Sequence, residues 1–298
     1  MRIEAKNAVY SMDKNNEPTA KTDLPARLSF ETKDCFGGQV KCEKDTLETL
    51  DFNHVNPATG PVYLNGVKPG DVIAVHIRDI KIKSPGVMVA APGAGVLGEM
   101  VSQSQTLIVP VENGVAKFKD IELPLNPMIG VIGVAPAGEP VACGTPDNHG
   151  GNMDTTLICP GSTLYLPVQV EGALLAMGDL HAAMGNGEIM VSGVEVGGEV
   201  EVTVEKATEL SMANPMVVTE NVVAIIVSSE DLDVAVESAT KEMAKFLEQN
   251  TDLSLNEAGM LMSACGNVEI SQVVDPLKTA RFSMSRSVMK KLGVGLAF

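Results

Sequence analysis

The sequence contains few aromatic residues, which make up 3% of its 298 residues, and it has no tryptophan at all. Hydrophobic residues still reach 45%, so a core must be built from aliphatic side chains and from the 16 methionines. The charged fraction of 20% is normal for a globular protein. A chain of this length can bury a full core, and we expect one large domain or two.

Positive charge is also scarce. The chain has 22 Lys and Arg residues against 38 Asp and Glu residues, which gives a formal net charge of −16. Such a charge repels the phosphate backbone of nucleic acids, and no cluster of Lys or Arg offsets it. Nucleic-acid binding is therefore disfavoured, whereas a small neutral substrate is compatible with this composition.

Long apolar runs are missing as well. No segment approaches the roughly 20 apolar residues that a membrane-spanning helix needs. The N-terminal segment 1–18 lacks the apolar centre of a signal peptide. We therefore expect no membrane partner and a cytoplasmic location.

The cysteines are few and scattered. The five positions are Cys35, Cys42, Cys143, Cys159 and Cys265. Their odd number and the lack of Cys-x-x-Cys spacing argue against a disulfide framework and against a thiolate zinc cluster. We expect reduced and mostly buried thiols. Cys143 precedes a loop that contains a histidine, so it could act as a nucleophile paired with that histidine.

The first two thirds of the chain consists of short strand patterns separated by turns rich in Gly and Pro. In segment 198–207, Val200, Val202 and Val204 alternate with polar residues, which gives one apolar face and one charged face. Further strands are expected at 60–64, 71–82, 105–111 and 164–170. This spacing is typical of a β-sandwich or a barrel, and we predict a jelly-roll-like β-sandwich.

The pattern changes after about residue 208. A continuous apolar run at 222–228 predicts a buried strand. Apolar residues at helical spacing then predict a helix over 232–247, and Ser228 and Ser229 are available to cap its N-terminus. This part of the chain is therefore expected to be of the α+β class.

A second helix is predicted to begin at Ser254, because Ser254 and Glu257 have the spacing of a capping box, and to end near Gly266. Two strands and a terminal helix are expected at 268–274, 280–284 and 286–292. We therefore predict a β-rich domain at 1–207 that carries the site. An α+β subdomain at 208–298 would pack on it.

Two glycine-rich loops on either side of the predicted strand near 164–170 carry polar side chains that packing does not require. Their acids and histidines are Asp147, His149 and Asp154 in the first loop, and Asp179, His181 and Glu188 in the second. Glycines allow positive φ angles and close backbone approach, so such side chains can be aimed at one point. Carboxylates with imidazole suit zinc or a similar divalent ion. The alternative is structural, because Asp, Asn and Gly are also the usual turn residues.

The two remaining histidines have weaker claims to a site. His76 lies in the alternating segment 70–82, where a strand is expected, and a structural or surface role is favoured there. His54 lies in the irregular segment 52–61, and nothing in its surroundings indicates a site.

Several blocks of sequence, in order along nearly the whole chain, resemble the acetamidase/formamidase family. They are DCFGGQV at 34–40, NPATGPVYLNGVKPGDVIAVHI at 56–77, HGGNMD at 149–154, GSTLYLPVQVEGALLAMGDLHAAMGNGE at 161–188 and SQVVDP at 271–276. The resemblance implies hydrolysis of small linear amides, such as formamide or acetamide, to ammonia and a carboxylate. It also implies a mostly β fold with an added α+β part, and a metal in the active site. Zinc is expected, with calcium or manganese as alternatives.

Carried over residue by residue, the family pattern implies two sets of site residues. The metal-ligand set is Asp34, Asp154, Asp179 and His181. The catalytic set is Glu188 and His149. The chain departs from the family at Met184 and Asn186, where Gln and Asp are usual. Asn186 removes a carboxylate that could serve as ligand or proton acceptor, and Met184 makes the loop less polar.

Other functions stay open at this point. A cysteine-dependent amidase would use Cys143, and a non-catalytic β-sandwich would bind a metal or a small ligand without hydrolysing amides. Hydrolysis of a lactam, which is a cyclic amide, would need the same carbonyl chemistry. Because exposed strand edges favour pairing with another chain, we also expect a homodimer.

Overall fold

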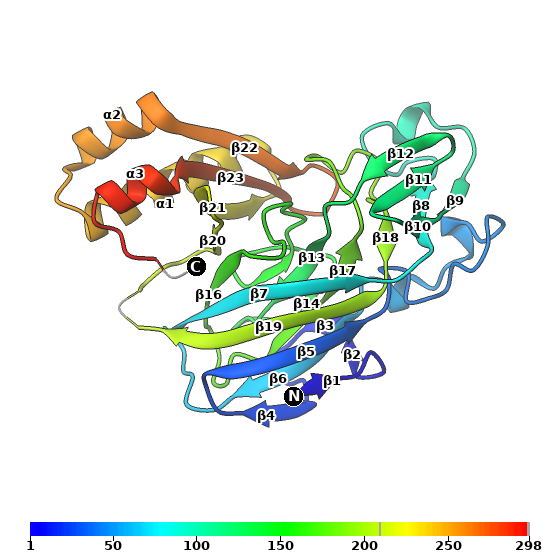
Figure 1. The fold of residues 1–298 in the computed structure, drawn as a ribbon, viewed down its shortest axis with the longest axis horizontal. Helices are drawn as coiled ribbons and strands as arrows, with labels where there is room; N and C mark the ends of the chain where they lie inside the picture. The colour runs from blue at the N-terminus through cyan, green and yellow to red at the C-terminus, as the bar shows by residue number, and fades with distance from the viewer. Residues whose placement is uncertain (209, 297–298) are drawn as a thin grey trace.

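A computed structural model describes residues 1–208 and 210–296. The described residues are mainly β and include three α-helices near the C-terminal end of the chain. The helices gather at one end of the molecule, and a small three-stranded sheet lies at the other (Figure 1). The mainly β fold class predicted from the sequence is confirmed.

The first of two nine-stranded sheets includes strands from both ends of the described chain. Its strands, in spatial order, are β1 (Arg2–Ile3), β5 (Ala26–Thr32), β19 (Gly198–Ala207), β7 (Val72–Ile82), β16 (Thr163–Pro167), β20 (Met216–Val218), β21 (Val222–Ser229), β23 (Lys278–Ser285) and β22 (Gly266–Gln272). Neighbouring strands are antiparallel except for β1 and β5, which are parallel.

The second nine-stranded sheet carries the candidate site. Its main path is β15 (Gly150–Asn152), β13 (Met128–Gly133), β17 (Leu175–His181), β18 (Glu195–Val196), β8 (Gly86–Ala90) and β9 (Gln105–Val109). β6 (Ala58–Leu64) also pairs with β17, and β2 (Ala8–Val9) and β4 (Ala20–Thr22) pair with β6. Every residue of β17 is buried. This strand is therefore a central element around which the site can be built.

Smaller elements complete the β structure. A three-stranded sheet contains β10 (Val111–Glu112), β11 (Val115–Phe118) and β12 (Ile121–Pro124), and β3 (Ser11–Met12) pairs with β14 (Val141–Ala142). Short 3-10 turns span Leu47–Thr49, Phe52–His54 and Gly98–Met100. The segment predicted as one strand at 105–111 is in fact divided between β9 and β10.

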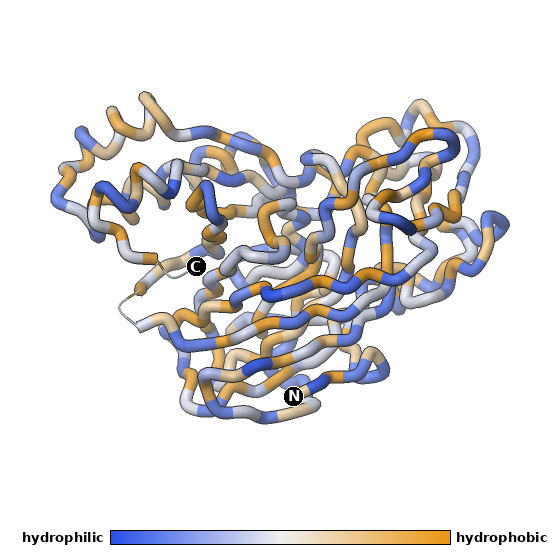
Figure 2. The backbone as a smooth tube through the Cα atoms, in the orientation of Figure 1, coloured by the Kyte–Doolittle hydropathy of each residue, from blue (hydrophilic) through white to orange (hydrophobic). Residues whose placement is uncertain are grey.

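The main core lies between the two large sheets and is largely aliphatic. In β19, Val200, Val202 and Val204 are buried, whereas Glu201 and Thr203 between them are only partly buried. Figure 2 shows the same alternation of hydrophobic and hydrophilic residues along strands of the first sheet. The predicted amphipathic strand at 198–207 is confirmed. Burial of its apolar face is the dominant stabilising contribution, at roughly 25 cal/mol per Å² removed from water.

The helices cover the end of the first sheet. α1 (Leu232–Asn250) packs on β21 and β23, and α2 (Leu255–Cys265) and α3 (Arg286–Lys291) lie nearby. The side chain of Asp231 caps α1 by accepting hydrogen bonds from two backbone N–H groups. The predicted caps Ser228 and Ser229 are wrong, because both residues belong to β21 and pair with β23. The capping box of Ser254 and Glu257 is confirmed.

The strands after residue 208 extend the same sheet, because β20 pairs with β16. They also share a second apolar cluster with α1 and α2, built around Met243, Phe246 and Met284. The proposed division into domains 1–207 and 208–298 stays a prediction, and it would place the boundary within a continuous sheet. None of the described helices is long and apolar enough to cross a bilayer.

Gly259 offers a test of how the C-terminal helices are stabilised. It lies inside α2, and a Cβ built on it would meet nothing within 4 Å. Gly259→Ala is therefore expected to stabilise the protein by about 0.5–1 kcal/mol, because alanine loses less backbone entropy on folding. Denaturant unfolding would measure this change.

The matched control for Gly259→Ala is Gly293→Ala. Gly293 also has open space around it, but its φ is +83°, a left-handed conformation that disfavours a Cβ. We expect this variant to be destabilised by about 1 kcal/mol. Stabilisation by both substitutions, or by neither, would contradict the entropic explanation.

Candidate functional site

The pairing of β17 with its neighbours assembles the candidate site. Asp179 and His181 lie on β17, and Glu195 begins β18 directly opposite His181. Residues opposite each other in an antiparallel pair have Cβ atoms about 5 Å apart. Asp154 follows β15, which reaches β17 through β13, and Glu188 lies in the loop after β17. Residues distant in the sequence are thereby brought to one point of the second sheet.

Four carboxylates surround the imidazole of His181. Its Nε2 atom lies 3.2 Å from Glu195 Oε2 and 3.3 Å from Asp179 Oδ1. The same nitrogen lies 3.8 Å from Asp154 Oδ1 and 3.9 Å from Glu188 Oε1. We call these five residues the acid–histidine cluster. The structure thus brings together four of the six predicted site residues and adds Glu195.

All members of the acid–histidine cluster are buried, and several of their polar atoms have no hydrogen-bond partner among the described residues. The unpartnered atoms are both carboxylate oxygens of Asp154, Asp179 Oδ1, His181 Nε2 and Glu195 Oε2. Buried polar groups are normally hydrogen-bonded, because burying one without a partner can cost several kcal/mol of folding free energy. A cluster of this kind suits a positively charged ligand that all of these atoms can face.

Burial and mutual repulsion shift the pKa values of the cluster. Burial raises the pKa of Glu188 to about 8 and that of Glu195 to about 7, and it raises the pKa of Asp154 well above its ordinary value. Burial alone would lower the pKa of His181, but the carboxylates of Glu195 and Asp179 raise it well above the usual value. The crowded acids therefore favour binding of positive charge.

The backbone at three of the acids is in the left-handed region. The φ angles are 41° at Asp154, 54° at Asp179 and 49° at Glu188. This conformation is uncommon for residues with a Cβ and persists only where the surrounding structure imposes it. Three of the nine non-glycine residues with a positive φ among the described residues are therefore acids of the cluster.

Gly130 on β13 makes room for two of these carboxylates. A Cβ built on Gly130 would lie 2.5 Å from Asp154 Oδ1 and in an even closer clash with Asp179 Oδ2. No ordinary side chain fits there without displacing the acids. The site is therefore shaped by an absent side chain as well as by those present.

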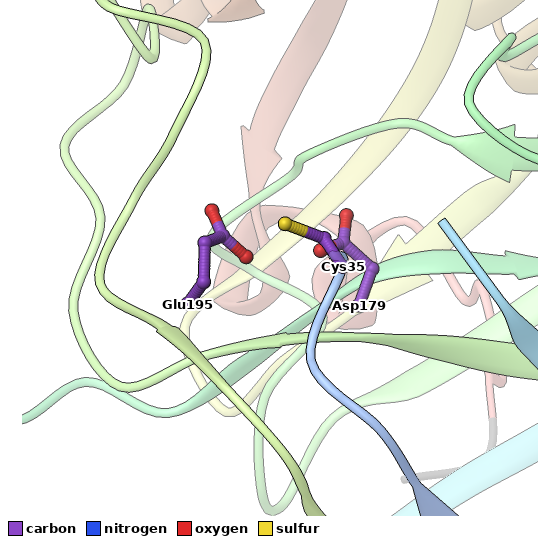
Figure 3. A group of neighbouring side chains, drawn as sticks. All are labelled: Cys35, Asp179 and Glu195. Carbon is purple, nitrogen blue, oxygen red and sulfur yellow. The ribbon is translucent and has the colours of Figure 1, made fainter. Parts of the chain in front are cut away.

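A second group of potential ligand atoms overlaps the cluster. The thiol of Cys35 and the carboxylates of Asp179 and Glu195 have ligand atoms within 4.8 Å of one another. Figure 3 shows the Cys35 sulfur directed toward the Glu195 carboxylate. Burial, together with the neighbouring carboxylates, raises the pKa of the Cys35 thiol well above its usual value. Cys35 is thus expected to be a neutral thiol beside the cluster.

Within the acid–histidine cluster, Asp154, His181 and Glu188 form another group of potential ligands, because their ligand atoms also lie within 4.8 Å of one another. Oxygen and imidazole donors of this kind fit zinc, and an oxygen-rich set also fits calcium or manganese. The unpartnered atoms and the space beside Gly130 agree with this donor set. The residues present therefore fit a divalent metal ion.

Asp34 and His149 belong to neither group among the described residues. The Asp34 carboxylate accepts a hydrogen bond from the Gly38 N–H at 3.0 Å. The ring of His149 is fully buried without a hydrogen bond to described residues, and burial lowers its pKa to about 4, so the ring is neutral. The ligand role of Asp34 and the catalytic role of His149 stay predictions.

Cys143 lies away from these groups. It is fully buried in an apolar cluster with Met12 and Val131, and its Sγ lies 3.6 Å from the carbonyl oxygen of Val9. Burial raises the pKa of its thiol to about 12. These surroundings disfavour a nucleophilic thiolate, so the structure gives no support to an amidase that uses Cys143.

Two acids, Glu195 in the cluster and Asp275 beside it, carried no functional assignment from the sequence. Glu195 occurs in a Val- and Gly-rich segment that reads as a hairpin, and its partner His181 is identified only by strand pairing. Asp275 lies in the block at 271–276, and its Oδ2 accepts a hydrogen bond from Asn152. Burial and the nearby Asp154 raise the pKa of Asp275 well above its ordinary value. The family block could have indicated Asp275, but no local signal indicates Glu195.

The two departures from the family pattern lie in different places. The Met184 sulfur is 3.2 Å from Nδ1 of His181, so it contacts the ring of a cluster member. A thioether is a weak acceptor and holds the ring less firmly than an amide oxygen would. Asn186 Oδ1 instead accepts hydrogen bonds from Thr156 and from buried Arg281. With Asn at position 186, Arg281 thus lacks the nearby negative charge that an Asp would supply.

The fold and the site together define a β-sandwich protein with a buried acid–histidine centre. The chain matches the model of the acetamidase/formamidase family over residues 14–143 and 139–280. It therefore belongs to the acetamidase/formamidase family.

Solved structures agree with this assignment. The crystal structure of an acetamidase from Bacillus halodurans has a TM-score of 0.97 and 49% sequence identity, and the match covers 99% of this chain and 100% of that one. A predicted acetamidase/formamidase from Thermoanaerobacter tengcongensis has a TM-score of 0.97 and 46% identity, with 99% and 98% covered. The fold therefore extends over nearly the whole described chain.

Curated relatives are more distant. The acetamidase of Mycolicibacterium smegmatis is 31% identical over 256 residues, which covers 63% of this chain and 63% of the relative. The chain spans 62%, 58% and 63% of the lengths of three such relatives. Because the chain spans only about three fifths of their length, the activities of these relatives are only proposed for this protein.

Proposed function

We propose that this protein hydrolyses linear amides to ammonia and a carboxylate, with the help of a divalent metal ion. The observation that carries the proposal is the buried acid–histidine cluster, with its unpartnered atoms, in a chain of the acetamidase/formamidase family. Amide hydrolysis needs a positive centre beside groups that transfer protons. The cluster offers ligand atoms that can hold a metal ion and acids that can transfer protons.

The residues proposed to hold the ion are Asp154, Asp179 and His181, with Glu195 as an additional ligand, because all three carboxylates lie within 3.8 Å of His181 Nε2. A bound divalent ion would polarise the amide carbonyl and make an attacking water more acidic. We propose zinc as the ion, because imidazole and carboxylates are among its usual ligands, with calcium or manganese as alternatives.

Glu188 is the proposed general base. Its carboxylate lies at the edge of the cluster, 3.9 Å from His181 Nε2, and it also lines a cavity beside the loop that follows β17. It can therefore take a proton from water at the site and deliver a proton to the leaving nitrogen. His149 remains a second proposed proton carrier. A cytoplasmic homodimer is also retained as a proposal.

The direct test is ammonia release from formamide, acetamide and a γ-lactam, with and without a metal chelator. We expect amide turnover to fall at least about a hundredfold after metal removal and to return when zinc, calcium or manganese is added back, because the acids alone polarise the carbonyl poorly. Elemental analysis would identify the ion.

Chelator already saturated with metal serves as the control for inhibition by the chelator itself. Full turnover by metal-free protein would contradict the metal-dependent mechanism while leaving amide hydrolysis in place. Absence of ammonia from every amide, with metal bound, would instead favour a non-catalytic binding protein.

A further inference from the structure

A pocket of about 460 Å³ opens beside the acid–histidine cluster. Its walls are largely apolar and come from several distant segments. The apolar residues that matter here are Phe36, Leu47, Phe52, Val55, Val89 and Val191. Four polar residues also line it, namely Cys35, Glu48, Asn56 and Asp275. The pocket therefore has an extensive apolar part, and we call the side lined by Cys35 and Asp275 its polar end.

The polar end of the pocket adjoins the cluster. The Cys35 thiol lies close to the carboxylates of Asp179 and Glu195, as Figure 3 shows. Asp275 accepts a hydrogen bond at 3.0 Å from the side chain of Asn152, which lies two residues before Asp154. A molecule in this pocket would thus present one end to the cluster and the other to the apolar walls.

Backbone hydrogen bonds fix the walls relative to the site. The N–H of Asn56 donates to the carbonyl of Cys35 at 2.6 Å, which joins the Phe52 side of the pocket to its polar end. Val96, two residues beyond the wall residue Ala94, donates its N–H to the carbonyl of Ile189 at 2.8 Å. Ile189 directly follows Glu188, the proposed base. These hydrogen bonds therefore hold two segments near the pocket in a fixed position relative to Cys35 and Glu188.

The exposed residues that line the pocket include the apolar Phe52 and Pro92 as well as the charged Glu48. Phe52 is 63% exposed although it lines the pocket, and Val96, Leu97 and Met100 are exposed in the loop that continues from the pocket wall. Formamide and acetamide carry at most a methyl group on the carbonyl carbon, so neither would contact most of these side chains.

Pockets of about 300–1,000 Å³ with mainly apolar walls and a few polar groups are typical of sites for larger organic ligands. We infer that the preferred substrates are primary amides with a bulky apolar acyl group, either branched alkyl or aryl; this inference rests on the amide hydrolysis proposed above. The carboxamide lies at the Cys35 and Asp275 end, and the acyl group lies against Phe36, Phe52 and Val191.

The chemistry is the same for these substrates as for acetamide. Water forms the new C–O bond at the carbonyl carbon, the C–N bond breaks, and nitrogen leaves as ammonia, which keeps its two hydrogens and takes one proton that originates from water. The carboxylic acid then gives its proton to ammonia, so the products are one carboxylate and one ammonium ion for each water consumed. The apolar walls change only how tightly the amide, and its transition state, are bound.

The test compares kcat/KM for ammonia release from acetamide, 3-methylbutanamide and phenylacetamide by the metal-loaded protein. We expect phenylacetamide and 3-methylbutanamide to exceed acetamide at least about tenfold, since one methylene in an apolar pocket is worth that much. Acetamide that is cleaved as well as the larger amides would overturn this inference and leave the proposed function standing. If no amide releases ammonia, the proposed function fails and the inference fails with it.

A variant tests the placement of the acyl group. Phe52→Ala is expected to lower the ratio of kcat/KM for phenylacetamide to that for acetamide about tenfold, because it removes one apolar wall. Ile121→Ala is the matched control, since Ile121 is 58% exposed and does not line this pocket. It should leave the ratio unchanged. An unchanged ratio in Phe52→Ala would place the acyl group elsewhere and overturn the inference.

Discussion

Replacing Asp179 with alanine is expected to abolish ammonia release, with a loss of about a thousandfold or more, and to lower the amount of bound metal. Asp179 belongs to the group with Cys35 and Glu195, and its Oδ1 lies 3.3 Å from His181 Nε2. Removing its carboxylate therefore affects both groups of ligand atoms at once. We expect His181→Ala to have the same result, because His181 faces all four acids.

Asp179→Asn separates charge from shape. It keeps the size of the side chain but offers a neutral oxygen, so metal content should fall even where circular dichroism shows a native fold. The control is Asp252→Ala, which removes an exposed carboxylate between α1 and α2 and should leave turnover unchanged. If Asp179→Ala kept both its activity and its metal, Asp179 would have to be removed from the proposed site.

Local patterns predicted the secondary structure well where neighbouring residues decide it. The alternating valines of β19 and the capping box of Ser254 and Glu257 depend on spacings of two and three residues, which a sequence shows directly. The cap of α1 was predicted wrongly because Ser228 and Ser229 pair with β23, which lies about fifty residues further on. The helix still begins at Leu232, as predicted, but its N-cap is Asp231 and neither serine.

The site residues also divide into those that local sequence patterns indicated and those that only tertiary contacts bring in. Asp154, Asp179, His181 and Glu188 lie in glycine-rich loops or at the end of a strand, and their clustering in the sequence indicated a shared point. The residues missed by local patterns come from elsewhere. Glu195 faces His181 through a strand of only two residues, and such a strand has no periodicity to read.

Cys35 shows the limit of reading residue types without contacts. No pattern in the sequence placed it in the site, whereas the structure puts its side chain beside Asp179 and Glu195. The ligand role of its neighbour Asp34, which the family resemblance implies, stays a prediction. Cys143, singled out in the sequence for its histidine-containing loop, instead fills an apolar core.

Gly130→Ala is expected to reduce turnover at least about a hundredfold although it adds only one methyl group. The new Cβ would clash with carboxylate oxygens of Asp154 and Asp179, and it can be accommodated only if these acids or β13 move. A displacement of about 1 Å at reacting groups can cost a hundredfold in rate. Overpacking would also destabilise the fold by about 1–3 kcal/mol, so turnover must be measured well below the unfolding midpoint.

Gly138→Ala provides the matched control, since a Cβ at Gly138 would meet nothing within 4 Å and its φ lies outside the left-handed region. It should leave turnover and metal content unchanged. Metal content distinguishes the explanations for Gly130→Ala: displaced ligands lose the ion, whereas a merely weakened fold retains it at low temperature. A folded Gly130→Ala protein with normal turnover would mean that the two acids can move apart without consequence. The space beside Gly130 would then be a detail of packing, and the case for a metal would depend on the unpartnered atoms of the cluster alone.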